Sequence, residues 1–367
     1  MMPTDLDFTD ADRAHMRAAL ALAARGLGRT APNPSVGCVL VRQGRVLGRG
    51  WTQPGGRPHA ETEALRRAGD AARGATAYVT LEPCSHYGKT PPCADALIAA
   101  GVARVVAALV DPDRRVSGSG LARLQGAGVE TACGLMAREA EALNRGYILQ
   151  RTARRPLVTL KLATSLDGKI ALASGESRWI TGEAARAEGR LLRARHDAVA
   201  VGIGTALADD PSLTVRLPGL EGAPQPLRVV FDSRARLPAD AKLAIDGAAE
   251  TLVLTGPGAP ARIGGAETAA CRLDAAGRID VEEALALLAA RGITRLMVEG
   301  GGELAAALLR ADLIDEIWWF RAGLVIGADG APGVGPLGLG ALREAGRLTL
   351  REARRVDRDL LEVWARP

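Results

Sequence analysis

Three side chains of the kinds that bind zinc stand close together in the first third of the sequence. His59 begins a His-Ala-Glu tripeptide, and Cys84 and Cys93 each follow a proline. Zn²⁺ prefers imidazole nitrogen and thiolate sulfur, and three protein ligands leave the fourth tetrahedral position for water, as in catalytic zinc sites. Glu61, two residues after the histidine, could then act as proton shuttle beside that water. A structural site stays an alternative at this point, because His86 could supply a fourth ligand.

The candidate ligands stand at the ends of expected secondary-structure elements. Apolar spacing predicts a helix that starts after His59 and ends at Gly69, a strand over residues 77–81 before Cys84, and a helix over Cys93–Ala100. The N-terminus of a helix carries positive potential, which favours thiolate over thiol. The sequence therefore predicts elements that deliver the three ligands in the charge state that zinc needs.

Helix-like and strand-like segments alternate along both halves of the chain, which indicates layered α/β domains. In the first half of the chain, the residue pattern predicts a helix over Asp10–Gly26, a hairpin over residues 36–51 and a buried strand over residues 104–110. Residues 144–156 are basic and lose clear periodicity, so we expect two domains, residues 1–153 and 154–367. In the second half the expected strands are 157–163, 197–202, 227–232, 251–255, 295–299 and 359–365, with a helix at 281–290 and a long loop at 327–340.

Composition excludes several classes of protein. With 367 residues, 47% hydrophobic and 24% charged, the chain is long enough for two globular cores. Its net charge of +5 comes from arginines interleaved with acids and only 3% of its residues are aromatic, so we expect no nucleic-acid partner. No run approaches the ~18 apolar residues of a membrane span. Five cysteines without a secretion signal predict reduced thiols in the cytoplasm. A homo-oligomer is one alternative for the assembly.

Longer blocks around the zinc residues resemble a known family. The segments TLEPCSHYGKTPPCADAL around the cysteines, TAPNPSVG at 30–37 and DPDRRVSGSG at 111–120 are similar to the bacterial bifunctional riboflavin deaminases and reductases. The resemblance implies an N-terminal cytidine-deaminase-like three-layer α/β/α domain. The resemblance also implies substrate contacts from Asn33, His86, Lys89 and Asp111. Glu63, where relatives often have His or Asn, and Asp113, where they usually have Asn, depart from the family pattern.

The second half resembles the reductase domain of the same family, which implies a dihydrofolate-reductase-like α/β fold and NADPH as cofactor. Matching blocks include LKLATSLDGKIA, SGESRWIT, VGIGTALADDPSLTVR, FDSRARLP and VEGGGELAAALL. The residues that the resemblance places at NADPH are Ala163, Trp179, Thr205, Asp209, Ser233, Gly301, Gly302, Glu303, Leu304, Ala305, Ala306 and Ala307. Those that it places at the substrate are Lys161, Ser177, Arg193, Leu213, Arg216 and Glu299.

Several of these positions also make chemical sense on their own. Glycines after Glu299 permit close backbone approach, and the helix that follows them offers free N–H groups to a pyrophosphate. Arg234, beside Ser233, could bind the 2′-phosphate of NADPH, and Arg193 could bind a substrate phosphate. Asp167 is a further candidate, for proton donation at the reacting centre.

The resemblance implies a bifunctional enzyme with one Zn²⁺ per chain and NADPH. Its substrate would be a phosphorylated pyrimidine, 2,5-diamino-6-(5-phosphoribosylamino)pyrimidin-4-one, which is deaminated and whose ribosyl group is then reduced to ribityl. One alternative is a nucleoside or tRNA deaminase with an unrelated C-terminal module. Another is a non-catalytic regulator that binds zinc and a nucleotide. Glu61 separates this last alternative from an enzyme, because a structural zinc site has no use for a proton shuttle.

Overall fold

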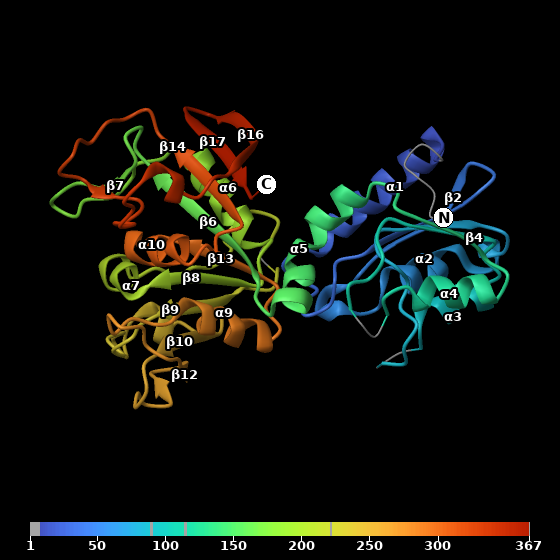
Figure 1. Cartoon of the computed structure of the whole chain (residues 1–367), viewed down its shortest axis with the longest axis horizontal. Coiled ribbons are helices and arrows are strands. Elements are labelled where there is room, and N and C mark those ends of the chain that lie inside the picture. The colour runs from blue at the N-terminus through green and yellow to red at the C-terminus, as the bar shows by residue number, and fades with distance from the viewer. Residues whose placement is uncertain (1–7, 89–90, 114–115, 221, 367) are drawn as a thin grey trace. The chain divides into compact units, whose positions relative to one another are not determined.

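The computed structural model describes residues 8–88, 91–113, 116–220 and 222–366, which separate at Arg154 and Arg155 into an N-terminal and a C-terminal unit (Figure 1). The helices of the N-terminal unit are α1 (Asp10–Ala23), α2 (Ala60–Ala68), α3 (Cys93–Ala99), α4 (Ser119–Gly126) and α5 (Ala137–Ala153). Its strands are β1 (Gly37–Arg42), β2 (Arg45–Trp51), β3 (Thr76–Val79), β4 (Arg104–Ala107) and β5 (Glu130–Cys133).

Local sequence signals set the ends of the first two helices. Thr9 caps α1 by accepting a hydrogen bond from the backbone of Asp12, whose carboxylate bonds back to the Thr9 N–H. This capping box satisfies two N–H groups that the first turn leaves free. Helix α2 begins directly after His59 and ends at Gly69, whose positive φ terminates it. The expected helices and the β1–β2 hairpin are thereby confirmed.

The N-terminal unit is a three-layer α/β/α sandwich, as the sequence predicts. Its five-stranded sheet has the order β2-β1-β3-β4-β5, with β3, β4 and β5 parallel and the β1–β2 hairpin antiparallel. Alternate side chains of the strands pack on opposite faces, against α2, α3 and α4 on one side and α1 and α5 on the other (Figure 1). The carboxyl ends of β3 and β4 therefore meet the start of α3 and α4 at one edge.

The sequence did not predict α5, because residues 144–156 show no clear periodicity, but the structure has a continuous helix to Ala153. The helix buries polar as well as apolar groups, which weakens its apolar period. Asn144 is buried and its side-chain oxygen accepts from the backbone of Ser35 at 3.0 Å. Tyr147, also buried, donates to Asp111 at 3.1 Å. The expected strand over 104–110 is also shorter, since the chain leaves the sheet after Ala107 to approach the loop that follows β3.

The C-terminal unit is built on a ten-stranded sheet of order β11-β12-β10-β9-β8-β13-β6-β14-β17-β16. The strands of this sheet are β6 (Leu157–Thr164), β8 (Ala198–Gly202), β9 (Leu227–Phe231), β10 (Thr251–Thr255), β11 (Arg262–Ile263), β12 (Ala266–Ala270), β13 (Arg295–Glu299), β14 (Glu316–Arg321), β16 (Thr349–Val356) and β17 (Asp359–Ala365). A separate two-stranded sheet joins β7 (Lys169–Ala171) and β15 (Ala331–Pro332). The helices are α6 (Glu183–Arg193), α7 (Ile203–Asp209), α8 (Lys242–Ile245), α9 (Val281–Ala290) and α10 (Gly302–Arg310).

Helices cover both faces of the central part of this sheet. The strands that run from β12 to β14 in the order of the sheet are parallel, namely β12, β10, β9, β8, β13, β6 and β14. At the two ends of the sheet, β11, β16 and β17 pair antiparallel. One face packs on α9 and α10, and the other on α6, α7 and α8. Parallel strands buried on both faces explain the continuous apolar runs in the sequence. This arrangement agrees with the expected dihydrofolate-reductase-like α/β fold. Within the described residues, no helix is long and apolar enough to cross a membrane.

Candidate active sites

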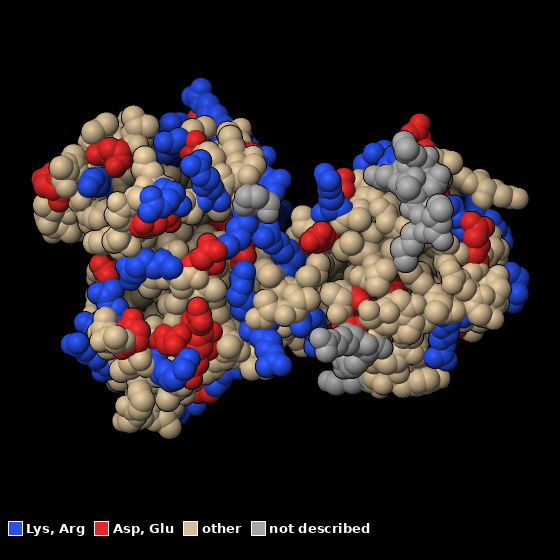
Figure 2. Space-filling view, viewed as in Figure 1, with Lys and Arg blue, Asp and Glu red and all other residues tan. Residues whose placement is uncertain are grey.

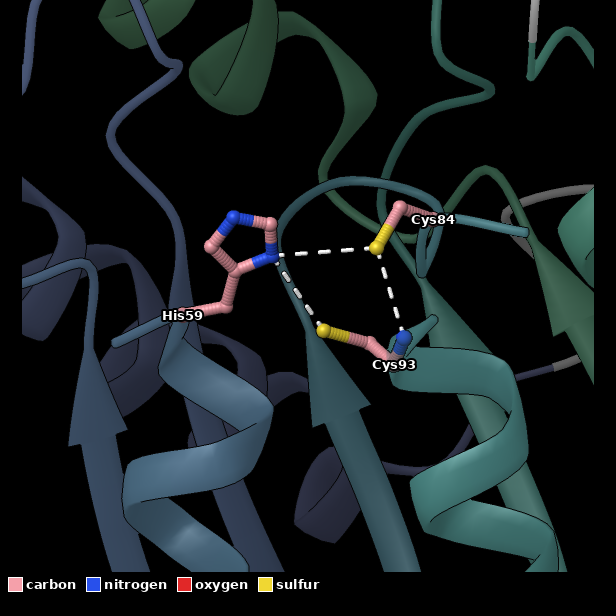
Figure 3. A group of neighbouring side chains, drawn as sticks. All are labelled: His59, Cys84 and Cys93. Carbon is pink, nitrogen blue, oxygen red and sulfur yellow. Dashed lines mark hydrogen bonds between the residues drawn. The ribbon is translucent and has the colours of Figure 1, made fainter. Parts of the chain in front are cut away.

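His59, Cys84 and Cys93, here called the donor cluster, converge although they come from three separate segments (Figure 3). His59 precedes α2, Cys84 lies in the loop after β3, and Cys93 opens α3. The His59 Nδ1 atom lies 3.3 Å from Cys93 Sγ and 3.7 Å from Cys84 Sγ. A tetrahedral zinc ion requires its nitrogen and sulfur ligands to lie about 3.6 Å apart. The donor cluster therefore has the composition and the spacing of a zinc site.

Within the donor cluster, the electrostatics favour a thiolate at Cys84, whereas the hydrogen bond with Cys84 and burial raise the pKa of the Cys93 thiol. Hydrogen bonds from Cys93 and then from His59 outweigh burial and lower the pKa of the Cys84 thiol to about 4. The Cys93 backbone N–H, at the start of α3, donates to Cys84 Sγ at 3.3 Å. Helix N-termini stabilise thiolates in this way. The pKa of His59 is raised, chiefly by its hydrogen bond with Cys84.

Glu61 lines the same cavity as His59 and Cys84 of the donor cluster. Its side chain is buried, and burial raises its pKa to about 7. The cavity, here called the N-terminal cavity, has a volume of about 80 Å³. A carboxyl group with a pKa near neutrality can both accept and release a proton at physiological pH.

The other sequence-predicted residues of the first half reach the N-terminal cavity as far as the structure describes them. Asn33, His86 and Asp111 all line it. The side-chain nitrogen of Asn33 donates to the carbonyl of Gly56 at 2.8 Å. The buried Nδ1 of His86 has no hydrogen-bond partner within the described part of the chain. Lys89 falls outside the described residues.

The two departures from the family pattern have different surroundings. Glu63 is not among the residues that line the N-terminal cavity, and it forms ion pairs with Arg66 at 3.1 Å and Arg67 at 3.6 Å. Asp113 lines the N-terminal cavity, 3.8 Å from the guanidinium of Arg151. Only Asp113 is therefore placed to act on a ligand.

Sequence reasoning missed five polar residues of this cavity. The cavity is lined, together with the expected set, by Thr52, Arg57, Glu82, Tyr147 and Arg151. Tyr147 and Arg151 lie on α5, where the sequence showed no clear pattern, and Glu82 bonds to backbone groups 29 to 39 residues away. Neither relation leaves a local signal, although TLEPC does place Glu82 two residues before Cys84.

A larger cavity of about 480 Å³, here called the C-terminal cavity, brings together most of the predicted reductase residues. The predicted residues that line it are Lys161, Ala163, Ser177, Trp179, Arg193, Thr205, Asp209, Leu213, Arg216, Glu299 and Gly301. Four more basic residues that were not predicted also line it, namely Arg178, Arg186, Arg190 and Lys242. Seven basic side chains thus face three acidic ones, Asp209, Asp210 and Glu299, so the cavity suits an anionic ligand.

A buried charge network forms one wall of the C-terminal cavity. The Nε and Nη2 atoms of Arg193 donate to the two oxygens of the Glu299 carboxylate, with Nη2 to Oε2 at 2.9 Å, and Nη1 donates to the Thr214 carbonyl at 2.9 Å. Burial alone would raise the pKa of Glu299, but the charge of Arg193 outweighs it and the pKa is lowered. Lys161 lies 4.0 Å from the same carboxylate, and burial lowers its pKa. Three ionisable groups are thus held together, Lys161 by the middle of β6 and the other two by the ends of β13 and α6.

The glycines between β13 and α10 form a second wall. Gly300 and Gly301 have φ values of 82° and 85°, which side chains rarely tolerate. A Cβ atom at Gly301 would lie 3.5 Å from the Thr205 hydroxyl and 3.6 Å from the Gly202 nitrogen. The backbone thus approaches the start of α7 closely, and the free N–H groups of α10 begin directly after these glycines.

The remaining predicted NADPH residues do not line this cavity. Ser233 accepts a hydrogen bond from the backbone of Ile279 at 3.1 Å. Glu303 is exposed and pairs with Arg278 at 2.7 Å. The others belong to α10, where Gly302 and Ala307 are half-buried and Leu304, Ala305 and Ala306 pack in the core. Asp167 holds the backbone of residues 326–327.

Comparison with known proteins covers both units. Residues 9–109 match the family described as cytidine and deoxycytidylate deaminase zinc-binding region. Residues 156–361 match the family described as RibD C-terminal domain. The second match excludes an unrelated C-terminal module, one of the alternatives that the sequence left open.

Similar proteins extend over almost the whole chain. The riboflavin biosynthesis protein RibD of Escherichia coli is 44% identical and covers 95% of this chain and 98% of its own. The RibD protein of Bacillus amyloliquefaciens is 42% identical and covers 87% of this chain and 86% of its own. Among solved structures, Acinetobacter baumannii RibD has a TM-score of 0.87 at 38% identity, covering 97% of this chain and 98% of its own. The chain therefore belongs to the RibD family, the bifunctional deaminases and reductases of riboflavin biosynthesis.

Proposed function

We propose that a deaminase domain, residues 1–153, removes the 2-amino group of 2,5-diamino-6-(5-phosphoribosylamino)pyrimidin-4-one by hydrolysis. A reductase domain, residues 154–367, then reduces the ribosyl group with NADPH to give 5-amino-6-(5-phosphoribitylamino)uracil. A similar Thermotoga maritima protein, 34% identical with a TM-score of 0.87 and covering 97% of this chain and 99% of its own, is named a diaminohydroxyphosphoribosylaminopyrimidine deaminase and 5-amino-6-(5-phosphoribosylamino)uracil reductase. The observation that carries the proposal is the meeting of His59, Cys84 and Glu61 in one small cavity, with Cys93 Sγ 3.3 Å from His59 Nδ1.

In the deaminase, His59, Cys84 and Cys93 would hold the zinc ion. When bound, zinc supplies Lewis acidity that makes water nucleophilic at neutral pH. Glu61 takes a proton from the attacking water, passes it to the ring nitrogen and finally delivers a proton to the departing ammonia. The oxygen of water replaces the amino group, so atoms and charge balance.

Three residues would orient the pyrimidine in the N-terminal cavity. His86 supports this assignment, because its buried Nδ1 has no partner among the described residues. The side-chain nitrogen of Asn33 donates to the Gly56 carbonyl, and its side-chain oxygen would accept a hydrogen bond from the pyrimidine ring. Asp111 lines the same cavity. Lys89 would pair with the substrate phosphate.

In the reductase, the substrate phosphate would bind to Ser177, Arg193 and Arg216. The positive charge of the two arginines supports this assignment. Leu213 would contact the pyrimidine, Glu299 would accept from ribose hydroxyls, and Lys161 would polarise the reacting carbon. NADPH is the hydride donor. The cofactor would lie along Ala163, Trp179, Thr205 and Asp209, with its pyrophosphate at Gly301 and the backbone of residues 302–307. Ser233 would contact its adenosine end.

The partner is thus a phosphorylated small molecule, and we infer no nucleic-acid partner. On the C-terminal unit, the face shown in Figure 2 carries Lys and Arg side chains beside Asp and Glu side chains. All five cysteines are free thiols, which supports a reducing compartment such as the cytoplasm.

The test is turnover of the diamino substrate with ammonia and NADPH absorbance followed separately. Without NADPH, wild-type protein should release ammonia and stop at the deaminated intermediate. Glu61→Gln should retain zinc, lose ammonia release by about 10²- to 10⁴-fold, and still oxidise NADPH on that intermediate. Glu63→Gln is the matched control, because this neighbour pairs with Arg66 and Arg67. Ammonia release by Glu61→Gln at the wild-type rate would overturn the assignment.

A further inference from the structure

Glu82 is a buried carboxylate to which the proposed reaction gives no role. It lies between the end of β3 and the ligand Cys84, with 4% of its surface exposed. Its backbone N–H donates to the carbonyl of Leu109 at 2.8 Å, which ties it to the chain leaving β4. A buried carboxylate is costly unless hydrogen bonds replace its lost hydration.

Four backbone N–H groups supply those hydrogen bonds, two in the loop between β4 and α4 and two in the first turn of α4. Glu82 Oε2 accepts from Asp111 at 3.1 Å and Gly118 at 2.8 Å. Its Oε1 accepts from Gly120 at 2.8 Å and Leu121 at 3.2 Å. One side chain thus holds both ends of the segment that joins β4 to α4.

Two of these bonds replace the missing cap of α4. The residue at the N-cap position is Gly118, which has no side chain to accept from the first turn. Gly120 and Leu121 are the second and third residues of the helix, the positions that an N-cap side chain normally satisfies. The negative charge of Glu82 also complements the positive end of the helix. The start of α4 therefore depends on a residue of the ligand-bearing segment.

The same segment is packed tightly against the chain beside Cys84. A Cβ atom at Gly120 would stand 2.0 Å from the Pro83 carbonyl oxygen, so the contact requires glycine. The hydroxyls of Ser85 and Ser119 lie 2.6 Å apart. Residues on both sides of Cys84 thus contact the first turn of α4.

The loop that Glu82 holds also carries Asp111. The Asp111 backbone N–H donates to Glu82. The Asp111 carboxylate accepts from the Tyr147 hydroxyl at 3.1 Å and from the Asp113 N–H at 2.9 Å. Asp111 and Asp113 both line the N-terminal cavity. Release of Glu82 would leave these two side chains without their backbone anchor.

We propose that Glu82 is a positioning residue for deamination, which fixes the loop of Asp111 and Asp113 against the segment of Cys84 and so sets the substrate's orientation. The proposal rests on the proposed deaminase function. It assigns Glu82 no contact with substrate. Its effect on catalysis passes through the loop that it anchors.

Glu82→Gln tests the proposal, because the amide keeps the shape but turns its NH₂ group toward two of the four donors. We expect the KM for the diamino substrate to rise about tenfold, with kcat within threefold and zinc still at one per chain. Amide hydrogen exchange at Gly118, Gly120 and Leu121 should become at least about tenfold faster. Glu82→Asp keeps both oxygens on a shorter stem and should fall between wild type and Glu82→Gln.

Glu141→Gln, on the exposed side of α5, is the matched control and should change none of these quantities. NADPH oxidation on the deaminated intermediate reports the C-terminal unit and should be unchanged in every variant. Wild-type protein that releases no ammonia would refute the proposed function. An unchanged KM in Glu82→Gln, with active wild type, would refute only the role of Glu82. Loss of zinc or unfolding of the unit in both Glu82 variants would also refute it, since the residue would then hold the fold and not the loop.

Discussion

The two cavities of this chain differ in volume and in the groups that line them. The N-terminal cavity, about 80 Å³, is built around side-chain donor atoms less than 4.8 Å apart. The C-terminal cavity, about 480 Å³, combines seven basic side chains with a glycine-rich backbone turn. A metal and a proton shuttle require short, fixed distances, whereas a dinucleotide and a phosphorylated substrate require length and positive charge. The difference predicts that single substitutions act more sharply in the first cavity than in the second.

Removal of a donor-cluster ligand should have the largest effect. Cys84→Ala should lose bound zinc and reduce ammonia release by at least about 10³-fold, since metal stabilisation contributes several kcal/mol. Metal analysis and the ammonia assay measure the two losses, and NADPH oxidation on the deaminated intermediate should persist. Cys133→Ala, at another buried thiol of the same unit, should keep zinc. A Cys84→Ala protein that retains zinc and activity would remove the contrast between the cavities.

The charge network of the C-terminal cavity should give a smaller loss. Arg193→Lys keeps the charge but loses the fork that holds Glu299, and we expect reductase kcat/KM to fall about 100-fold, or ~3 kcal/mol. Arg291→Lys is the matched control, because Arg291 makes the same two-bonded contact with Glu267 on the surface. Surface pairs contribute about 0–1 kcal/mol, so its reductase activity should stay near wild type. Equal losses in both variants would show that the network has no special role.

A buried histidine beneath the C-terminal cavity should give the smallest effect, on stability. His196 donates from Nδ1 to the Leu192 carbonyl at 2.8 Å and accepts at Nε2 from Thr159 at 2.9 Å. Burial lowers the pKa of His196 to about 3, against ~6.5 in an unfolded chain. The unfolded state therefore binds a proton first as the pH falls, and stability is lost from pH ~6.5 down toward 3.

Chemical unfolding followed by tryptophan fluorescence measures this loss, since Trp179, Trp318, Trp319 and Trp364 all belong to the C-terminal unit. Between pH 7.5 and 5.5 the wild-type unit should lose about 1.4 kcal/mol more than His196→Gln, which cannot titrate. An identical pH dependence in the two proteins would contradict the assignment of His196 as a neutral, buried group.

The sequence predicted the deaminase half better than the reductase half, and for a physical reason. Zinc ligands are few and chemically distinctive, and here they stand just before or after helices and strands, so His59, Cys84 and Cys93 could be selected from residue type and spacing alone. Residues such as Arg178, Arg186, Arg190 and Lys242 could not be selected in this way, because an arginine-rich surface offers many equivalents. Helix α5 was not predicted, because Asn144 and Tyr147 bury polar groups that interrupt the apolar period.

The sequence by itself determined the alternation of helices and strands, the capping of α1 and the identity of the donor cluster, because each depends on neighbours in the chain or on intrinsic side-chain chemistry. Only the tertiary structure decided which of the predicted residues share a cavity. Ser233 and the predicted residues of α10 lie outside the C-terminal cavity, although α10 directly follows Gly301 in the chain. Only the tertiary structure connected Glu82 to α4 as well. Its four partners are backbone N–H groups, and every residue except proline carries one, so no pattern of residue types can mark them.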